Sequence, residues 1–62
     1  MQPIERGDLL ITETAELEVR EVRDDTLAVV DTHNDHFEVV RDTANANRLN
    51  GTWELRKSVS DQ

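Results

Sequence analysis

The stretch LEVREVRDDTLAVVDTHNDHFEVV, residues 17–40, decides the fold. It contains three apolar runs, residues 17–22, 27–30 and 37–40, separated by polar segments rich in Asp. Runs of Val, Leu, Thr and Phe bounded by such segments are typical of β-strands joined by hairpins. The stretch therefore predicts three antiparallel strands, on which the remaining short segments pack.

Local irregularities are also predicted within this stretch. The apolar positions of the first run change face midway, so a β-bulge near Arg20-Glu21 is expected to restore the register. Asp24-Asp25 is expected to form a two-residue hairpin turn.

His33-Asn34-Asp35 is expected to cap the next hairpin, and Asn34 is the residue best able to adopt a positive φ. A two-residue loop would set Asp31 opposite Glu38, and like charges directly opposite are destabilising. We therefore favour a three-residue loop for this hairpin.

Segments outside the stretch complete the predicted architecture. Residues 9–12 form a short first strand, residues 42–51 a short helix and residues 52–57 a last strand with Trp53 and Leu55 on one face.

The helix is predicted from its end signals and from two apolar residues. Asp42 or Thr43 is suited to begin it and Gly51 to end it. Ala46 and Leu49 lie three residues apart, so they are expected to dock the helix on the sheet.

Five short strands with a helical turn between the fourth and fifth resemble the SH3-like small barrels, which include SH3, Tudor, chromo and KOW modules. The resemblance implies a mainly β, five-stranded antiparallel barrel with a closed interior, in a single domain over residues 1–62 with an ordered core of about 7–57. An OB-like barrel and a four-stranded sheet backed by the helix are the alternatives. The residues that carry the resemblance are Gly7-Asp8-Leu9, Leu17-Glu18-Val19, the hairpin 22–30 and residues 48–53.

The charge balance is the most informative global property. The chain has fourteen acidic and seven basic residues, its net charge is −7, and Lys57 is the only lysine. The acids are spread along the whole chain, a composition that resembles proteins of salt-in halophilic archaea. The Debye length falls from ~10 Å at ~0.1 M salt to ~3 Å at ~1 M, so salt removes the self-repulsion of such a domain. An ordinary acidic mesophilic protein is the alternative.

Size and composition limit the other possibilities. A 62-residue chain without Cys buries only ~60% of its unfolded surface and has no disulfide to stabilise it. A dimer is therefore weighed equally with a monomer. No apolar run approaches the ~20 residues of a membrane span, and the N-terminus has no basic region followed by an apolar core. A cytoplasmic location is expected.

Few residues have the chemistry of a catalytic or metal site. His33, Asp35 and His36 have metal-ligand atoms, but they lie in a predicted hairpin loop, where a solvated turn is the favoured interpretation over a zinc site. The acids alternate with core residues and face water, so no carboxylate pair is singled out as a general acid and base. No enzyme activity, cofactor or small-molecule substrate is predicted.

Four residues are the candidates for partner binding. Arg20, Arg23 and Arg56 would gather if the second and fifth strands were neighbours, which would favour a nucleic-acid-binding module of the Tudor or KOW type. Such binding weakens steeply with salt. Trp53 is expected to close the core against Val29 or Leu49, or to anchor an interface.

We therefore predict a small acidic interaction module, an adaptor or small regulatory subunit, from a salt-adapted cytoplasm. Another protein or a second copy of the chain is favoured as the partner over nucleic acid, and apolar contact through a sheet edge or around Trp53 is the expected means. A nucleic-acid-binding module is the alternative.

Overall fold

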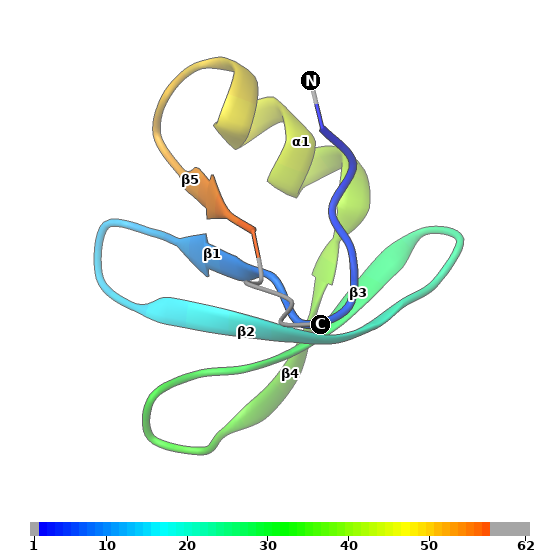
Figure 1. The fold of residues 1–62 in the computed structure, drawn as a ribbon, viewed down its shortest axis with the longest axis vertical. Helices are drawn as coiled ribbons and strands as arrows, with labels where there is room; N and C mark the ends of the chain where they lie inside the picture. The colour runs from blue at the N-terminus through cyan, green and yellow to red at the C-terminus, as the bar shows by residue number, and fades with distance from the viewer. Residues whose placement is uncertain (1, 58–62) are drawn as a thin grey trace.

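Five strands form one antiparallel sheet in the order β4-β3-β2-β1-β5 (Figure 1). The computed structural model describes residues 2–57. The prediction of a mainly β fold, with five strands and one short helix between the fourth and fifth, is confirmed. The elements are β1 (Leu9–Ile11), β2 (Glu16–Val22), β3 (Thr26–Val30), β4 (His36–Val40), α1 (Arg41–Leu49) and β5 (Glu54–Arg56).

The sheet is open. Within the described residues, β4 pairs only with β3 and β5 only with β1, so the expected closed barrel does not form. The helix α1 connects β4 to β5 and covers the gap between them (Figure 1). Because Ala44 of α1 joins the buried core, helix packing replaces strand pairing on this side of the sheet.

The core is built from cross-strand rows on one face of the sheet. Leu10 lies between Leu17 and Leu55 in the ladder, and Leu10 itself is fully buried. A second row runs from Val19 through Val29 to Phe37 and a third from Val22 through Leu27 to Val39. Antiparallel partners on one face bring their side chains into contact, so the alternation in the sequence becomes a continuous apolar layer.

The predicted bulge and first hairpin turn are confirmed. The register of β2 against β3 shifts between Val19 and Glu21, which leaves Arg20 as the extra residue. The Arg23 N–H donates to the Thr26 carbonyl at 2.9 Å, so Asp24-Asp25 is the two-residue turn. A bulge bends a strand and increases its twist, which lets β2 pair with both β1 and β3 around the core.

The second hairpin has a loop of three residues, as predicted, but the loop lies one residue earlier than His33-Asn34-Asp35. The Asp31 N–H donates to the Asp35 carbonyl at 3.0 Å, which encloses residues 32–34. Asn34 adopts a φ of 67°, as predicted. In this register Glu38 lies opposite Ala28 and not opposite Asp31, so the unfavourable carboxylate pair is avoided.

The docking face of α1 was predicted wrongly. Leu49 is 73% exposed and Ala46 is exposed, whereas Ala44 is fully buried. Because the chain passes directly from β4 into the helix, β4 sets the rotation of α1. The half-buried positions beside Ala44 include Arg41 and Arg48, whose guanidinium groups donate to backbone carbonyl oxygens.

The ends of α1 agree with the prediction at one terminus only. The N-cap residue is Val40, with no side-chain cap, so neither Asp42 nor Thr43 begins the helix. Asp42 lies in the first turn, where a negative charge interacts favourably with the helix dipole. Gly51 follows the helix with a φ of 84° and donates to the Arg48 carbonyl at 3.2 Å, which confirms it as the stop.

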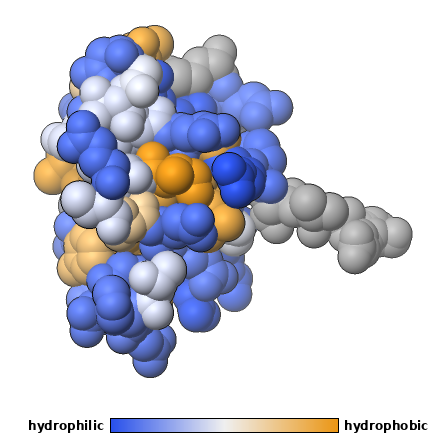
Figure 2. Space-filling model, turned by 90° about the vertical axis from the view of Figure 1, so that its left-hand side faces the viewer, coloured by the Kyte–Doolittle hydropathy of each residue, from blue (hydrophilic) through white to orange (hydrophobic). Residues whose placement is uncertain are grey.

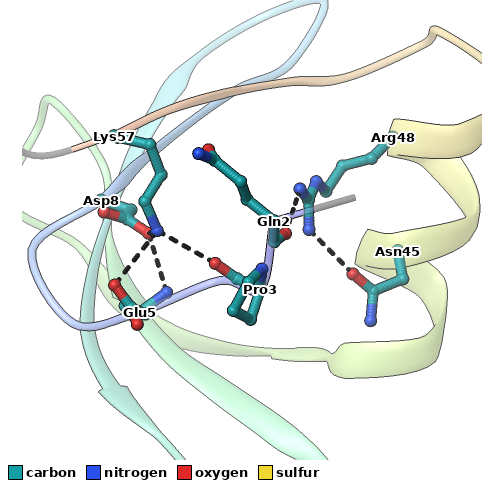
Figure 3. A network of polar contacts seen from close by, with 7 residues as sticks. All are labelled: Gln2, Pro3, Glu5, Asp8, Asn45, Arg48 and Lys57. Carbon is teal, nitrogen blue, oxygen red and sulfur yellow. Dashed lines mark hydrogen bonds and ion pairs between the residues drawn. The ribbon is translucent and has the colours of Figure 1, made fainter.

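The N-terminal segment is held against the domain by a polar network (Figure 3). Lys57 Nζ lies 2.8 Å from Asp8 Oδ2, 3.0 Å from the Pro3 carbonyl and 3.2 Å from Glu5 Oε1. Arg48 donates to the Gln2 carbonyl. Ile4, between these attachments, is 7% exposed and belongs to the core, so the packed region begins before the predicted start at residue 7.

Candidate functional site

Among residues 2–57, the backbone of β4 is paired along one side only. Bonds at its two ends establish which residues face β3: the Asp31 N–H donates to the Asp35 carbonyl, and the Arg41 N–H donates to the Asp25 carbonyl at 2.8 Å. In an antiparallel ladder, residues that exchange hydrogen bonds alternate with residues that do not. The odd-numbered residues of β4 therefore bond to β3, and the even-numbered residues direct their backbone groups away from the sheet.

Three residues of β4 present backbone groups at this free edge: His36, Glu38 and Val40. The Val40 carbonyl is engaged by the helix, because an N-cap residue accepts the first intrahelical bond. The free groups are then the N–H groups of all three residues and the carbonyls of His36 and Glu38. Such a row is a template for pairing with another strand.

The side chains of β4 give this edge little protection. Natural edge strands are usually very short or carry Pro or charged side chains, especially Lys, whereas β4 has five residues, no Lys or Pro, and Glu38 as its one acidic residue. The opposite edge strand, β5, has only three residues, of which Glu54 and Arg56 are charged. Of the two edges, β4 is thus the one suited to receive a strand.

Exposed apolar side chains are also concentrated at β4. Among the described residues, Phe37 is 43% exposed and Val40 is 52% exposed; Leu49 at the end of α1 is the third large exposed apolar residue. On the face that Figure 2 shows, hydrophilic residues surround a small apolar area. Phe37 lies on the same face as the core rows, so a strand added at β4 would extend that apolar layer.

The one carboxylate within β4 is compensated. Arg23 donates to Glu38 and, at 2.8 Å, to Glu21. The hydrogen bond to Glu21, reinforced by the charges of both carboxylates, raises the pKa of the Arg23 guanidinium. Arg41 donates to the carbonyls of Arg23 and Asp24, both at 3.0 Å, so two arginines reinforce the turn beside the end of β4.

The candidate metal ligands are not gathered into a site. His33, Asp35 and His36 lie in or next to the β3–β4 hairpin loop, and residues 2–57 contain no group of three or more His, Cys, Asp or Glu side chains able to hold a metal ion. The loop carboxylate of Asp31 instead accepts the backbone N–H groups of His33 and Asp35 at 2.8 and 3.0 Å. The Asp31 side chain thus orders the turn.

Asp31 gives this hairpin an acid-sensitive contact. Hydrogen bonds from the backbone N–H of Asp35 and, less strongly, of His33 lower the pKa of Asp31 below its usual 3.8. A carboxylate whose pKa is lower in the folded state than in the unfolded state stabilises the fold at pH values above its unfolded pKa. This stabilisation is lost as the pH falls through the folded pKa. In a carboxyl NMR titration, Asp31 should titrate below 3.8, and Asp31→Asn should reduce the loss of stability on acidification below pH 3.8. Titration at or above 3.8 would contradict this account.

The three candidate arginines are not brought together by strand pairing. β1 lies between β2 and β5, so the condition for gathering Arg20, Arg23 and Arg56 is not met. Arg20 lines an open groove of about 800 Å³ with Arg6, and it pairs with Glu18 at 3.5 Å. Arg56 lies opposite Leu9 across β1. Acidic neighbours therefore compensate Arg20 and Arg23 separately.

Trp53 is partly buried and packs against the core cluster. It precedes β5, and its backbone N–H donates to the Asn47 carbonyl at 3.0 Å. One side of it lines a hollow of about 470 Å³ with Arg48, Gly51 and residues of β5. Trp53 thus contributes to the core and keeps an accessible side.

Phe37 and the free backbone of β4 were not among the residues singled out from the sequence. A sheet edge was expected to make contacts, but the strand was not identified. The missing information was the strand order: once β5 pairs with β1, β4 is left at the end of the meander. The signal available was the absence of Lys and Pro from residues 36–40.

Comparisons with known proteins add no relative. We found no match to a protein-family model and no significant match to a curated protein or a solved structure. Residues 2–57 also contain no helix long and apolar enough to cross a membrane. The site must therefore be interpreted from its own geometry.

Proposed function

We propose that the protein is a non-enzymatic interaction module, an adaptor or small regulatory subunit, that pairs with a partner strand along β4. The free edge of β4 carries this proposal. Strand addition uses main-chain hydrogen bonds for affinity and alternate side chains for specificity, and β4 offers outward backbone groups beside the exposed side chains of Phe37 and Val40. Backbone bonding and apolar contact also depend less on ionic strength than contacts between surface charges do.

The proposal includes an SH3-like relationship for the fold. Five strands with a single helix between β4 and β5 support it, and the bulge at Arg20 is the kind of device that curves a small sheet around its core. In this view the domain is an opened small barrel, in which α1 fills the place where β4 and β5 do not meet.

Phe37→Thr is the variant that tests the interaction function. Thr has a side chain with high β-propensity, as Phe has, but it lacks the aromatic ring, so partner binding should fall about tenfold. The measurement is quantitative mass spectrometry of proteins retained by the immobilised chain from an extract at native salt, compared between wild type and variant.

Leu49→Thr is the matched control, because Leu49 is also a large exposed apolar residue but lies at the end of α1. It should retain the partner as wild type does. A second edge variant, Glu38→Pro, removes an N–H that points away from β3 and should reduce binding as well. Equal partner recovery by all four proteins would exclude β4 as the binding edge.

We also propose that the protein belongs to a salt-adapted cytoplasm, on the support of its net charge of −7. Its melting temperature should rise by about 5 °C or more between about 0.1 M and about 2 M KCl, because screening removes self-repulsion. Circular dichroism melts measure this. Neutralising two exposed carboxylates with Glu13→Gln and Glu16→Gln should make the rise smaller; equal midpoints for wild type in both salts would refute salt adaptation.

A further inference from the structure

We infer that the strand received by β4 is β4 of a second copy of this chain, paired antiparallel about a two-fold axis at Phe37. This inference rests on the proposed function, because it names the occupant of the same edge. Isologous pairing about a two-fold axis is the commonest way in which identical chains associate. Two five-stranded sheets would then join into one continuous sheet across the two β4 strands.

The alternation of backbone groups restricts the possible registers. Only His36, Glu38 and Val40 direct backbone groups outward, so the hydrogen-bonded pairs of a symmetric dimer must match these positions with each other. The axis can then lie at residue 37, 38 or 39 with at least two of these positions matched. Each choice places different side chains opposite one another.

Side-chain chemistry selects among the three registers. An axis at residue 38 sets Glu38 directly opposite the partner's Glu38, and like charges at opposed positions are destabilising. An axis at residue 39 pairs residue 38 with the partner's Val40, which brings the starts of the two α1 helices toward each other, since α1 begins at Arg41. An axis at residue 37 avoids both conflicts.

The register centred on Phe37 also creates complementary pairs. His36 faces the partner's Glu38, and the reverse, so an imidazole meets a carboxylate twice. Phe37 faces the partner's Phe37 at a non-hydrogen-bonded position, where Cα atoms are only ~4.5 Å apart and aromatic side chains pair favourably. Phe37, which is 43% exposed in the single chain, would thereby be covered.

Charge determines how this dimer responds to salt. Each copy has a net charge of −7, so two copies repel at low ionic strength, although Arg23 compensates Glu38 next to the edge. Salt should therefore tighten self-pairing. A basic extended peptide at the same edge would show the opposite response, because salt weakens attraction between opposite charges.

The absence of cysteine from the chain permits a direct test of register. Single variants Phe37→Cys, Glu38→Cys and Val39→Cys are each oxidised mildly in about 2 M KCl, and disulfide-linked dimer is measured on non-reducing gels. A symmetric disulfide forms readily only at the axis, where Cα atoms lie within the ~4.4–6.8 Å that the bond requires. Leu49→Cys, on the exposed end of α1, measures random collision. Phe37→Cys should link at least about tenfold faster than Leu49→Cys.

Sedimentation equilibrium of the unmodified chain completes the test. The wild type should have twice the mass of one chain, with a dissociation constant that falls as KCl rises, and Phe37→Thr should raise that constant about tenfold. Fastest linkage at Glu38→Cys or Val39→Cys would overturn the register. A wild-type monomer at all concentrations, with no cysteine variant linking faster than Leu49→Cys, would overturn self-pairing. In that case, Phe37-dependent retention of another protein from the extract would still support the proposed function.

Discussion

Leu10→Ala should lower the free energy of unfolding by about 3 kcal/mol, within the range measured for leucines truncated in well-packed cores. Leu10 is fully buried, and its ladder partners Leu17 and Leu55 come from both neighbouring strands. A 62-residue domain has a total stability of about 3–9 kcal/mol. The melting temperature should therefore fall by about 15 °C or more, measured by circular dichroism.

Leu9→Ala is the control for this prediction. Leu9 is the adjacent residue of β1, but it is only half-buried and its side chain lies on the opposite face of the strand. Its truncation should cost about 1 kcal/mol. Equal losses of stability in the two variants would mean that the inner face of β1 is not the centre of the core.

Asp8→Ala should also destabilise the fold strongly, by about 2 kcal/mol or about 10 °C in melting temperature. The Asp8 residue is 1% exposed, and its carboxylate accepts the Glu5 N–H and pairs with Lys57, both at 2.8 Å. Removing the carboxylate leaves both donors without this partner. Asp8→Asn should be intermediate, because an amide oxygen can still accept the Glu5 N–H but has no charge for Lys57.

Two measurements should distinguish the Asp8–Lys57 pair from an ion pair on the surface. Glu5→Gln should have little effect, because the Glu5 side chain is 66% exposed. The hydrogen bond to Asp8 raises the pKa of Lys57, so the stabilisation is fully present below its ordinary pKa of 10.5 and is lost as pH rises through the raised value. Asp8→Ala should remove this alkaline loss. A melting temperature unchanged by Asp8→Ala would contradict a structural role for the pair.

Local features were predictable because each depends on residues close in sequence. The bulge at Arg20 follows from the change of apolar face in β2. The Asp24-Asp25 turn follows from the short polar segment that separates two apolar runs in the sequence. Asn34 was identified because a positive φ is tolerated best by Asn and Gly. The number of strands and their antiparallel pairing were predicted correctly for the same reason.

Features that depend on tertiary arrangement were not predictable in the same way. The helix was expected to dock through Leu49, but the direct connection from β4 rotates Ala44 inward. The buried Asp8 was not identified, because its partner Lys57 is 49 residues away. The free edge at β4 required knowledge that β5 pairs with β1, a pairing between strands far apart in the sequence.

That late pairing has a consequence during synthesis on the ribosome. Within this domain β1 is synthesised before the other strands, yet one of its two neighbours is the last strand, β5, and Asp8 pairs with Lys57, which follows β5. Until residues 54–57 leave the exit tunnel, a nascent chain exposes a second unpaired strand edge beside an incomplete apolar layer. Folding of this domain must therefore finish after nearly all of it has been translated, and the nascent chain is most open to misassociation just before that point.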